Sequence, residues 1–355
     1  MSSLLEHAGC WFLRSGIQES NGGVARYYLA ESGRNLPVSS EITGYALSTL
    51  VYLHSQSGQA AYLDAALRAA NFLTHEAWDP QSSTFPFEPG SDRAYFFDIG
   101  IIVRGLLAAW RASGEEAFRN RAREAALSLA FDFMGDGVFH PIISLPDKQA
   151  VPYEPRWSRT PGCFQLKAAL AWLEIGREMG DEHANKLFES VLAYSLATHA
   201  TFLPSDLDRE LIMDRLHAYS YFLEGLLAVA DREEVRRALD EGVARAGALF
   251  REIAPQFERS DVAAQILRVR LIAHRLGALP LDVTAAREEA VHARSFQAGP
   301  GEPDLRLRGG FFFGSKKGAL LPFSNPVSTA FCLQALELWK QHEADRWSFD
   351  LTQLI

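Results

Sequence analysis

The sequence of 355 residues is poor in cysteine, in blocks of like charge and in long charge-free apolar runs. Its cysteines, Cys10, Cys163 and Cys332, are odd in number, lie far apart and form no C-x-x-C pair. They therefore predict neither a disulfide framework nor a zinc site, and we expect no metal and no cofactor. No segment is apolar for as long as a membrane span requires, so we expect no membrane partner.

The balance of charge is acidic. The formal net charge is −9, and no run of like charges is long enough to form a tail. This argues against a nucleic-acid partner, because phosphate backbones are bound by clustered lysine and arginine. The first residues, "MSSLLEHAGCWFLRSGIQ", carry Glu6, His7 and Arg14 within an apolar pattern and have no positive leading region. They predict an amphipathic helix rather than a signal peptide, and we expect a cytoplasmic protein.

One kind of segment recurs six times along the chain. Each copy is apolar nearly all round, is rich in alanine and glycine, and opens on a polar or aromatic residue, which predicts a helix surrounded by protein. The six segments are "SEITGYALSTLVYL" from Ser40, "FFDIGIIVRGLLAAW" from Phe96, "GCFQLKAALAWL" from Gly162, "DRLHAYSYFLEGLLAVA" from Asp214, "SDVAAQILRVRLIAHRL" from Ser260 and "NPVSTAFCLQALELWK" from Asn325. We call them inner helices.

Six segments of a second kind alternate with them. These have apolar residues at helical spacing and charges on the opposite face, as in "EEAFRNRAREAALSLAFDFM" and "REEVRRALDEGVARAGALFREI". Such helices have one solvent-exposed side, and we call them outer helices. Six alternations of outer and inner helices predict an all-α fold, an (α/α)6 toroid in which residues 1–355 form a single domain.

The connections before the inner helices are long and aromatic, at residues 18–39, 79–95, 135–160, 201–213 and 297–324. They would gather at the rim where the inner helices begin, and long loops on a rigid scaffold are where binding sites are usually built. Gly22-Gly23 and Gly309-Gly310 occupy corresponding places before the first and the last inner helix. They predict short β-hairpins in the rim loops.

Six helix pairs with Gly-Gly turns, and with carboxylates or aromatics opening the inner helices, resemble the six-hairpin glycosidase-like superfamily. The resemblance covers the whole chain, matches no catalytic motif, and implies glycoside hydrolase, unsaturated uronyl hydrolase, polysaccharide lyase or sugar epimerase activity on a carbohydrate. "QESNGGV" is also similar to the Q-x-x-x-G-x-W element of terpenoid cyclase toroids, with Val24 in place of the tryptophan. The chain lacks the D-x-D-D and D-D-x-x-D motifs of isoprenoid chemistry and the zinc ligands of prenyltransferases.

Glu224 stands inside the apolar segment "YSYFLEGLLAVA". A carboxylate is rarely buried unless it is paired or takes part in chemistry. Alignment of the inner segments places Arg104, Lys167, Glu224 and Gln334 in one column. We interpret Glu224 as a structural brace paired with Arg104 or Lys167 rather than as a catalytic acid.

Other carboxylates lie near the starts of inner helices: Glu41, Asp98, Asp214 and Asp261. Each is also explained by helix capping. As a set they fit glycosidic bond cleavage, which uses two carboxyl groups about 6.5 to 9.5 Å apart in inverting enzymes and about 5 to 5.5 Å apart in retaining ones. We favour Asp98 and Asp214 as the acid and base.

The motif "DRLHAYSY" adds further candidates. If Asp214 caps its helix, His217 faces the mouth of the toroid, where it would act as an acid or base near neutral pH. Side chains expected to bind substrate lie on these helices and in the rim loops: Glu41, Tyr45, Tyr153, Arg156, Trp157, Arg215, Tyr219, Phe312 and Lys316. Aromatic faces stack on sugar rings, and the cations would pair with uronate carboxylates.

Three functions stay open at this point. The leading one is a glycoside hydrolase that acts on an oligosaccharide, with or without uronate. The second is a uronate epimerase or lyase in which His217 or a tyrosine abstracts a proton. The third is a toroid without catalysis that binds a glycan or a protein, since fold alone does not decide function.

Overall fold

The structure is a computed structural model that describes residues 3–204 and 207–355. The described residues contain twelve α-helices and eight short strands. They group into two compact units, one of Gly16–Arg26 and Asn35–Ala197 and the other of Met1–Ser15, Tyr27–Arg34 and Thr198–Ile355. We call these the α2–α7 unit and the α8–α12 unit and describe each by itself.

The α2–α7 unit consists of three helical pairs. Its inner helices are α2 (Ser40–Ser57), α4 (Phe96–Ser113) and α6 (Gln165–Met179). Its outer helices are α3 (Ala60–Phe72), α5 (Glu116–Phe131) and α7 (Glu182–Thr198). Helix α4 packs between α2 and α6, and α3 and α5 cover α2 and α4. In the connections, β3 (Arg93–Tyr95) pairs antiparallel with β4 (Ile142–Ser144).

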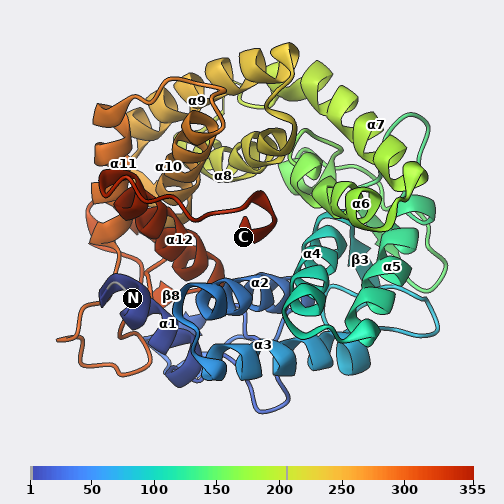
Figure 1. The fold of residues 1–355 in the computed structure, drawn as a ribbon, viewed down its shortest axis with the longest axis horizontal. Coiled ribbons are helices and arrows are strands. Elements are labelled where there is room, and N and C mark those ends of the chain that lie inside the picture. Colours follow the sequence, from blue (N-terminus) through green and yellow to red (C-terminus); the bar gives the residue numbers. More distant parts are fainter. Residues whose placement is uncertain (1–2, 205–206) are drawn as a thin grey trace. The chain divides into compact units, whose positions relative to one another are not determined.

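The α8–α12 unit repeats this plan. Its inner helices are α8 (Arg209–Leu226), α10 (Ser260–Arg275) and α12 (Pro326–Glu343). Its outer helices are α1 (Ser3–Arg14), α9 (Glu233–Ile253) and α11 (Val283–Ser295). Helix α10 packs between α8 and α12, and Figure 1 shows each inner helix of this unit beside an outer partner.

Short strands join the loops of the α8–α12 unit. Strand β1 (Tyr28–Leu29) pairs with β8 (Phe323–Ser324), and β2 (Arg34–Asn35) lies on the other side of β1. Strand β6 (Gly314–Lys316) pairs antiparallel with both β5 (Phe257–Arg259) and β7 (Ala319–Leu320). The expected strand content of the rim loops is therefore confirmed within the described residues.

The alternation of inner and outer helices follows from where the apolar residues stand. Helix α4 is buried from Phe96 to Ala109 without interruption, whereas α5 is buried only at helical intervals, as at Phe118, Ala122, Ala125 and Leu129. A helix that is apolar all round must be covered on every side, and a helix with one apolar stripe covers a neighbour. The predicted alternation is confirmed. The prediction that residues 1–355 form one domain stays a prediction.

The two Gly-Gly turns have the same construction in the two units. Gly22 and Gly309 have φ angles of 95° and 85°, which disfavour a side chain. A Cβ at either position would approach a backbone oxygen of an outer helix, Arg68 O or His7 O, to 2.3 Å. Single antiparallel bridges flank the turns, between Gln18 and Val24 and between Gln297 and Phe311, as the predicted hairpins require.

Glu224 is fully buried, and its partner is Arg268 rather than Arg104 or Lys167. Nη2 of Arg268 donates to Glu224 Oε1, and Nη1 donates to Gln334 Oε1 at 3.0 Å. The guanidinium of Arg268 lies 4.1 Å from the centre of the Phe331 ring. The interpretation of Glu224 as a paired structural residue agrees with this geometry, but the predicted partners are wrong.

The reason for the correction is that ion pairs form between neighbouring inner helices. Glu224 and Arg268 come from α8 and α10, which pack together. In the same way Arg104 of α4 pairs with Glu174 of the adjacent α6, with 2.7 Å between Nε and Oε1. Adjacent helices bring side chains to hydrogen-bonding distance, whereas alignment of all inner helices in one column assumed contact across the axis.

Replacement of Glu224 by glutamine should lower the free energy of unfolding by about 3 kcal/mol, because it leaves the buried Arg268 charge without compensation. Glu233→Gln is the matched control, since Glu233 pairs with Arg237 on the surface and is 89% exposed. The control should change stability by about 1 kcal/mol or less. Urea unfolding followed by circular dichroism measures both values, and equal stabilities of the two variants would contradict the brace.

Candidate functional site

The charged residues that open the inner helices form one cluster in each unit. The carboxyl pair, Glu41 and Asp98, lies in the α2–α7 unit at the starts of α2 and α4. The arginine cluster, Asp214, His217, Arg259, Asp261 and Gln265, lies in the α8–α12 unit where β5 leads into α10 beside α8. These two clusters contain all the catalytic candidates that the sequence suggests.

Asp98 is a buried carboxyl that lacks full compensation. It stands in the first turn of α4, has 7% of its surface exposed, and follows a helix N-cap at Tyr95 that makes no side-chain capping bond. Its Oδ2 atom is buried and has no hydrogen-bond partner among the described residues. Burial and the nearby charge of Glu41 raise the pKa of Asp98 well above its usual value. A carboxyl in this environment holds its proton to a higher pH than an ordinary aspartate.

Glu41 is the second member of the carboxyl pair. It is the second residue of α2, behind the N-cap Ser39, whose hydroxyl accepts from the backbone N–H of Ile42. Loss of hydration raises the pKa of Glu41 to about 7, and the positive charge of Arg26 offsets part of this rise. Because two interacting carboxyls cannot both ionise freely, the pair titrates as one coupled system. The charge of each carboxyl therefore depends on whether the other carries its proton.

Arg26 reaches this region from the loop before α2. Its Nη2 atom lies 3.1 Å from Glu88 Oε1, and its guanidinium lies 5.5 Å from the centre of the Phe87 ring. The positive charge is thus already shared with Glu88 and only partly offsets the carboxyl pair. Sequence reasoning missed Arg26. The available signal was its position directly after the Gly-Gly turn, in the loop that leads to Glu41.

Arg259 holds the arginine cluster together. Its Nε and Nη2 atoms donate to the two carboxylate oxygens of Asp261 at 3.0 and 2.7 Å, and Nη1 donates to Asp214 Oδ1 at 2.9 Å. Arg259 is itself 8% exposed and lies over the ring of Phe313. Burial raises the pKa of Asp261, but the charge and the hydrogen bonds of Arg259 lower it by more, so the net shift is downward and Asp261 stays ionised.

His217 is held as a neutral imidazole with a defined tautomer. Its Nδ1 atom lies 2.7 Å from Gln265 Oε1, an oxygen that can only accept, so Nδ1 carries the proton. Nε2 then accepts from the Tyr221 hydroxyl at 2.8 Å. Burial and the nearby charge of Arg259 lower the pKa of His217 to about 4. The imidazole and the phenol are therefore joined in one hydrogen-bonded pair.

Asp214 does not cap its helix, contrary to the prediction. Helix α8 begins at Arg209, and its N-cap is Asp208, whose side chain accepts from the backbone N–H of Glu210 at 2.8 Å. Asp214 thus lies more than one turn inside α8, and its side chain is 44% exposed. The predicted loop 201–213 ends early for the same reason, and its residues 205–206 lie outside the described residues.

Two predicted substrate-binding tyrosines are part of the core. Tyr45 is fully buried in α2, and Tyr219 is 1% exposed, with its hydroxyl 3.1 Å from His199 Nδ1. A side chain without exposed surface cannot stack on a sugar, so neither is retained as a substrate contact. Helical spacing alone did not separate the side chains that face the mouth from those that face the outer helices.

The other predicted contacts of the α8–α12 unit are engaged locally. Arg215 donates to Phe202 O at 3.0 Å, and Lys316 pairs with Glu210 at 2.7 Å. Phe312, 9% exposed, forms a single bridge with Ser324. Lys316 is about half-exposed, so its charge remains accessible to an anion. Roles in substrate binding stay predictions for these three residues.

The predicted contacts of the α2–α7 unit lie in the loop before α6. Tyr153 is 47% exposed, and its hydroxyl lies 2.7 Å from His140 Nδ1. Arg156 is exposed, and Trp157 is partly exposed and packs edge-on against Phe164. These side chains present an aromatic surface and a cation to solvent, which suits a sugar, and their substrate contacts stay predictions.

Residues 3–204 and 207–355 hold no group of three or more histidine, cysteine, aspartate or glutamate side chains that could bind a metal ion. None of their helices combines the length and the apolar character that a bilayer span needs.

Comparison with known proteins gives similarity at the level of structure. No protein-family model matches the chain, and no curated protein matches its sequence. Among solved structures, the chain is similar to a cellobiose 2-epimerase from Spirochaeta thermophila, with a TM-score of 0.73, 16% identity, and coverage of 96% of this chain and 95% of the other.

Two further structures show the same likeness. An unsaturated glucuronyl hydrolase specific for heparin matches with a TM-score of 0.68 and 12% identity, over 96% of this chain and 97% of the other. A GH76 α-mannanase from Bacteroides thetaiotaomicron matches with a TM-score of 0.64 and 12% identity, over 95% and 97%. The chain therefore has the all-α, (α/α)6 toroid fold of these structures, as the sequence predicted.

Proposed function

We propose that this protein is a carbohydrate-active enzyme, a glycoside hydrolase in which Asp98 is the general acid. The observation that supports this most strongly is the Asp98 carboxyl, which is buried, has an oxygen without a partner among the described residues, and has a raised pKa. A general acid must still hold its proton at the pH of the reaction, and enzymes achieve this by burial and by a nearby like charge. Both causes act on Asp98.

A second carboxylate is required in an ionised state. Asp214 is ion-paired with Arg259 at 2.9 Å and has 44% of its side chain exposed, which suits a base or a nucleophile that must meet water or a sugar. The two carboxyls thus lie in opposite environments, one buried near another acid and one beside an arginine. Glycosidases use such a division between acid and base.

Two observations support a carbohydrate substrate: the exposed side chains in the loops before the inner helices, and the similar solved structures. Tyr153 and Trp157 offer aromatic surface, and Arg156 and Lys316 offer exposed positive charge for a uronate. The similar structures carry the names of enzymes that act on cellobiose, heparin and mannan. We propose an oligosaccharide as the partner of this chain, and uronate as one of its components.

A specific observation favours sugar epimerisation as the second candidate. His217 is neutral, its tautomer is fixed by Gln265, and its Nε2 atom is joined to the hydroxyl of Tyr221. Such a pair can relay a proton to and from a carbon beside a carbonyl, and Arg259 would stabilise the enolate charge. In this reading the Asp98 carboxyl would be a structural residue.

One experiment separates the candidates. The protein is incubated in deuterium oxide with neutral and uronate oligosaccharides, while new reducing ends, unsaturated products and carbon-bound deuterium are followed. The proposal requires new reducing ends without deuterium at carbon. Deuterium at carbon without new ends supports the epimerase, and unsaturated products support a lyase. Binding with none of these changes leaves a glycan-binding toroid.

Asp98→Asn should lower turnover by about a hundredfold or more, because positioned acid catalysis contributes about 10² to 10⁴ in rate. The control is Asp64→Asn, which changes an exposed aspartate on the outer helix α3 of the same unit. It should leave turnover unchanged. Initial rates of reducing-end release measure both, and a loss of only a few-fold in Asp98→Asn would exclude Asp98 as the acid.

The same variant should be more stable than the parent protein at neutral and higher pH. Because folding raises the pKa of Asp98, the carboxyl costs nothing below its unfolded value of 3.8 and destabilises the fold as the pH rises through its folded value. The gain in Asp98→Asn should reach about 1.4 kcal/mol for each unit of the pKa shift. Urea unfolding from pH 4 to 8 tests this, and a gain that does not grow with pH would contradict a buried, proton-holding carboxyl.

A further inference from the structure

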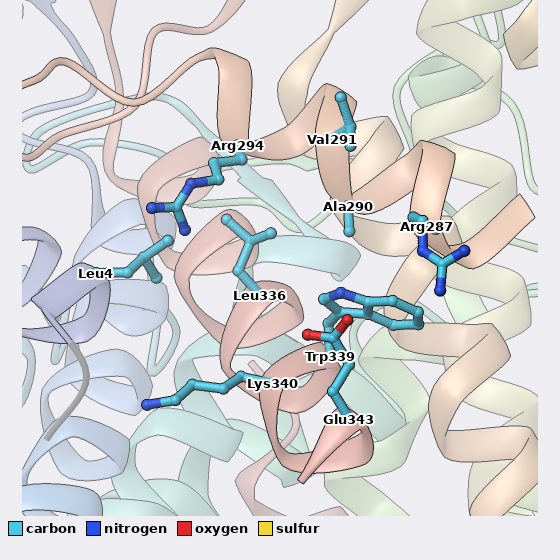
Figure 2. A pocket seen from close by; sticks show the side chains of 9 residues that line it. All are labelled: Leu4, Arg287, Ala290, Val291, Arg294, Leu336, Trp339, Lys340 and Glu343. Atoms are coloured by element: carbon cyan, nitrogen blue, oxygen red, sulfur yellow. The ribbon is translucent and has the colours of Figure 1, made fainter. Parts of the chain in front are cut away.

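A groove lies on the outer side of the α8–α12 unit, away from the starts of its inner helices. It has a volume of about 400 Å³ and is lined by α1, α11 and α12 (Figure 2). Helix α11 contributes Arg287, Ala290, Val291 and Arg294, and α12 contributes Leu336, Trp339, Lys340 and Glu343, each set at intervals that place side chains on one helix face. The α12 residues belong to the C-terminal half of that helix, and the candidate site lies near the N-terminal ends of α8 and α10.

The cationic side chains of this groove make no ion pairs that would stabilise the fold within the described residues. Arg287, Arg294 and Lys340 are exposed, and none of them makes an ion pair or a side-chain hydrogen bond with another described residue. The two neighbouring acids of α11 are committed elsewhere: Glu289 pairs with Arg270 at 2.8 Å and Glu288 lies 3.9 Å from Arg251. The protein as a whole carries a net charge of −9, so a surplus of free cations here is a local exception.

The floor of the groove is apolar, with polar groups at its edge. Leu336 and Trp339 are 7% and 9% exposed, and Figure 2 shows the Trp339 indole in the groove beside the carboxylate of Glu343. The indole N–H makes no hydrogen bond within the described residues, and it is not enclosed. Two guanidinium groups, an ammonium and an indole N–H are all donors, whereas Glu343 is an acceptor. A ligand that fits must carry anionic acceptors and a hydroxyl donor.

We propose that this groove binds an acidic oligosaccharide, at a site separate from the carboxyl pair and the arginine cluster. The choice of a sugar rests on the proposed function, and the choice of an anion rests on the free cations. Arg287 and Arg294 would hold carboxylates through charge-assisted hydrogen bonds, Glu343 would accept from a hydroxyl, and the apolar floor would cover the C–H face of a ring.

The spacing of the arginines favours an extended anion over a single small one. Arg287 and Arg294 are seven residues apart on α11, which is about 10 Å along the helix axis. A single small anion would have to draw both side chains together, whereas two acidic groups on linked sugars could each meet one guanidinium group. The site would hold an acidic oligosaccharide on the outer surface of this unit, which would raise the local concentration of substrate for the catalytic site.

The test uses the indole N–H resonance of Trp339 in ¹⁵N-labelled protein, assigned with Trp339→Phe. The protein carries Asp98→Asn so that turnover does not consume the probe. Digalacturonate, the acidic probe, is titrated in, and cellobiose, inorganic phosphate and an acidic glutamate peptide are titrated separately. The double variant Arg287→Ala/Arg294→Ala and the control Arg34→Ala, which removes an exposed cation outside the groove, are titrated in the same way.

Digalacturonate is expected to shift the Trp339 resonance, and the double variant is expected to weaken this binding by about tenfold or more, while Arg34→Ala leaves it unchanged. An unmoved Trp339 resonance overturns the inference, even if digalacturonate binds elsewhere or is cleaved by the parent protein, in which case the proposed function stands. An equal response to cellobiose or to phosphate, or tighter binding of the peptide, also overturns it.

Discussion

The charged side chains of the inner helices are surrounded by protein. The free-energy cost of removing each charge from water determines whether it is paired or has its pKa shifted. Where a partner stands on the neighbouring inner helix, the charge is kept, as for Glu224 with Arg268 and Arg104 with Glu174. Where a second acid stands nearby instead, the pKa of the carboxyl is raised, as for Asp98 beside Glu41. The same cost of desolvation therefore produces a buried ion pair in one place and a carboxyl with a raised pKa in another.

The difference between paired and unpaired buried carboxyls supports the proposed roles, with Asp98 as the acid and Asp214 as the ionised carboxylate. A carboxyl that only capped a helix would be satisfied by backbone N–H groups and would have a low pKa. Asp98 keeps an oxygen without a partner among the described residues and has a raised pKa, which is a standing cost to stability. Costs of this kind are concentrated at functional sites, because the surrounding fold is stable enough to bear them.

The sequence predicted the fold well because apolar periodicity reports directly on how many sides of a helix are covered. Helices α2, α4 and α10 begin at the expected Ser40, Phe96 and Ser260, and both Gly-Gly turns form where they were expected. The start of α8 was wrong because both Asp208 and Asp214 are plausible N-caps, and only the packed structure selects between them.

The site was less accessible to sequence reasoning. The carboxyls at the helix starts could be found from their positions, whereas Arg259 stands in a strand and Gln265 within an apolar helix, so neither lies in a recognisable pattern. The partner of Glu224 was within reach, because Arg268 is one of the few charges in the segment "AAQILRVRL". Which side of a helix Tyr45 or Tyr219 faces depends on the outer helices packed against it, and spacing does not contain that information.

The central claim is that burial and the nearby Glu41 raise the pKa of Asp98 well above its usual value, so that Asp98 can serve as a proton donor. Carbon-13 NMR of the aspartate side-chain carboxyls, with Asp98 assigned from the missing signal in Asp98→Asn, measures its titration directly. The account predicts a midpoint well above the usual 3.8, shifted toward lower pH when Glu41 is replaced by glutamine, because the like charge is then removed. A midpoint near 4, unaffected by Glu41→Gln, would contradict it.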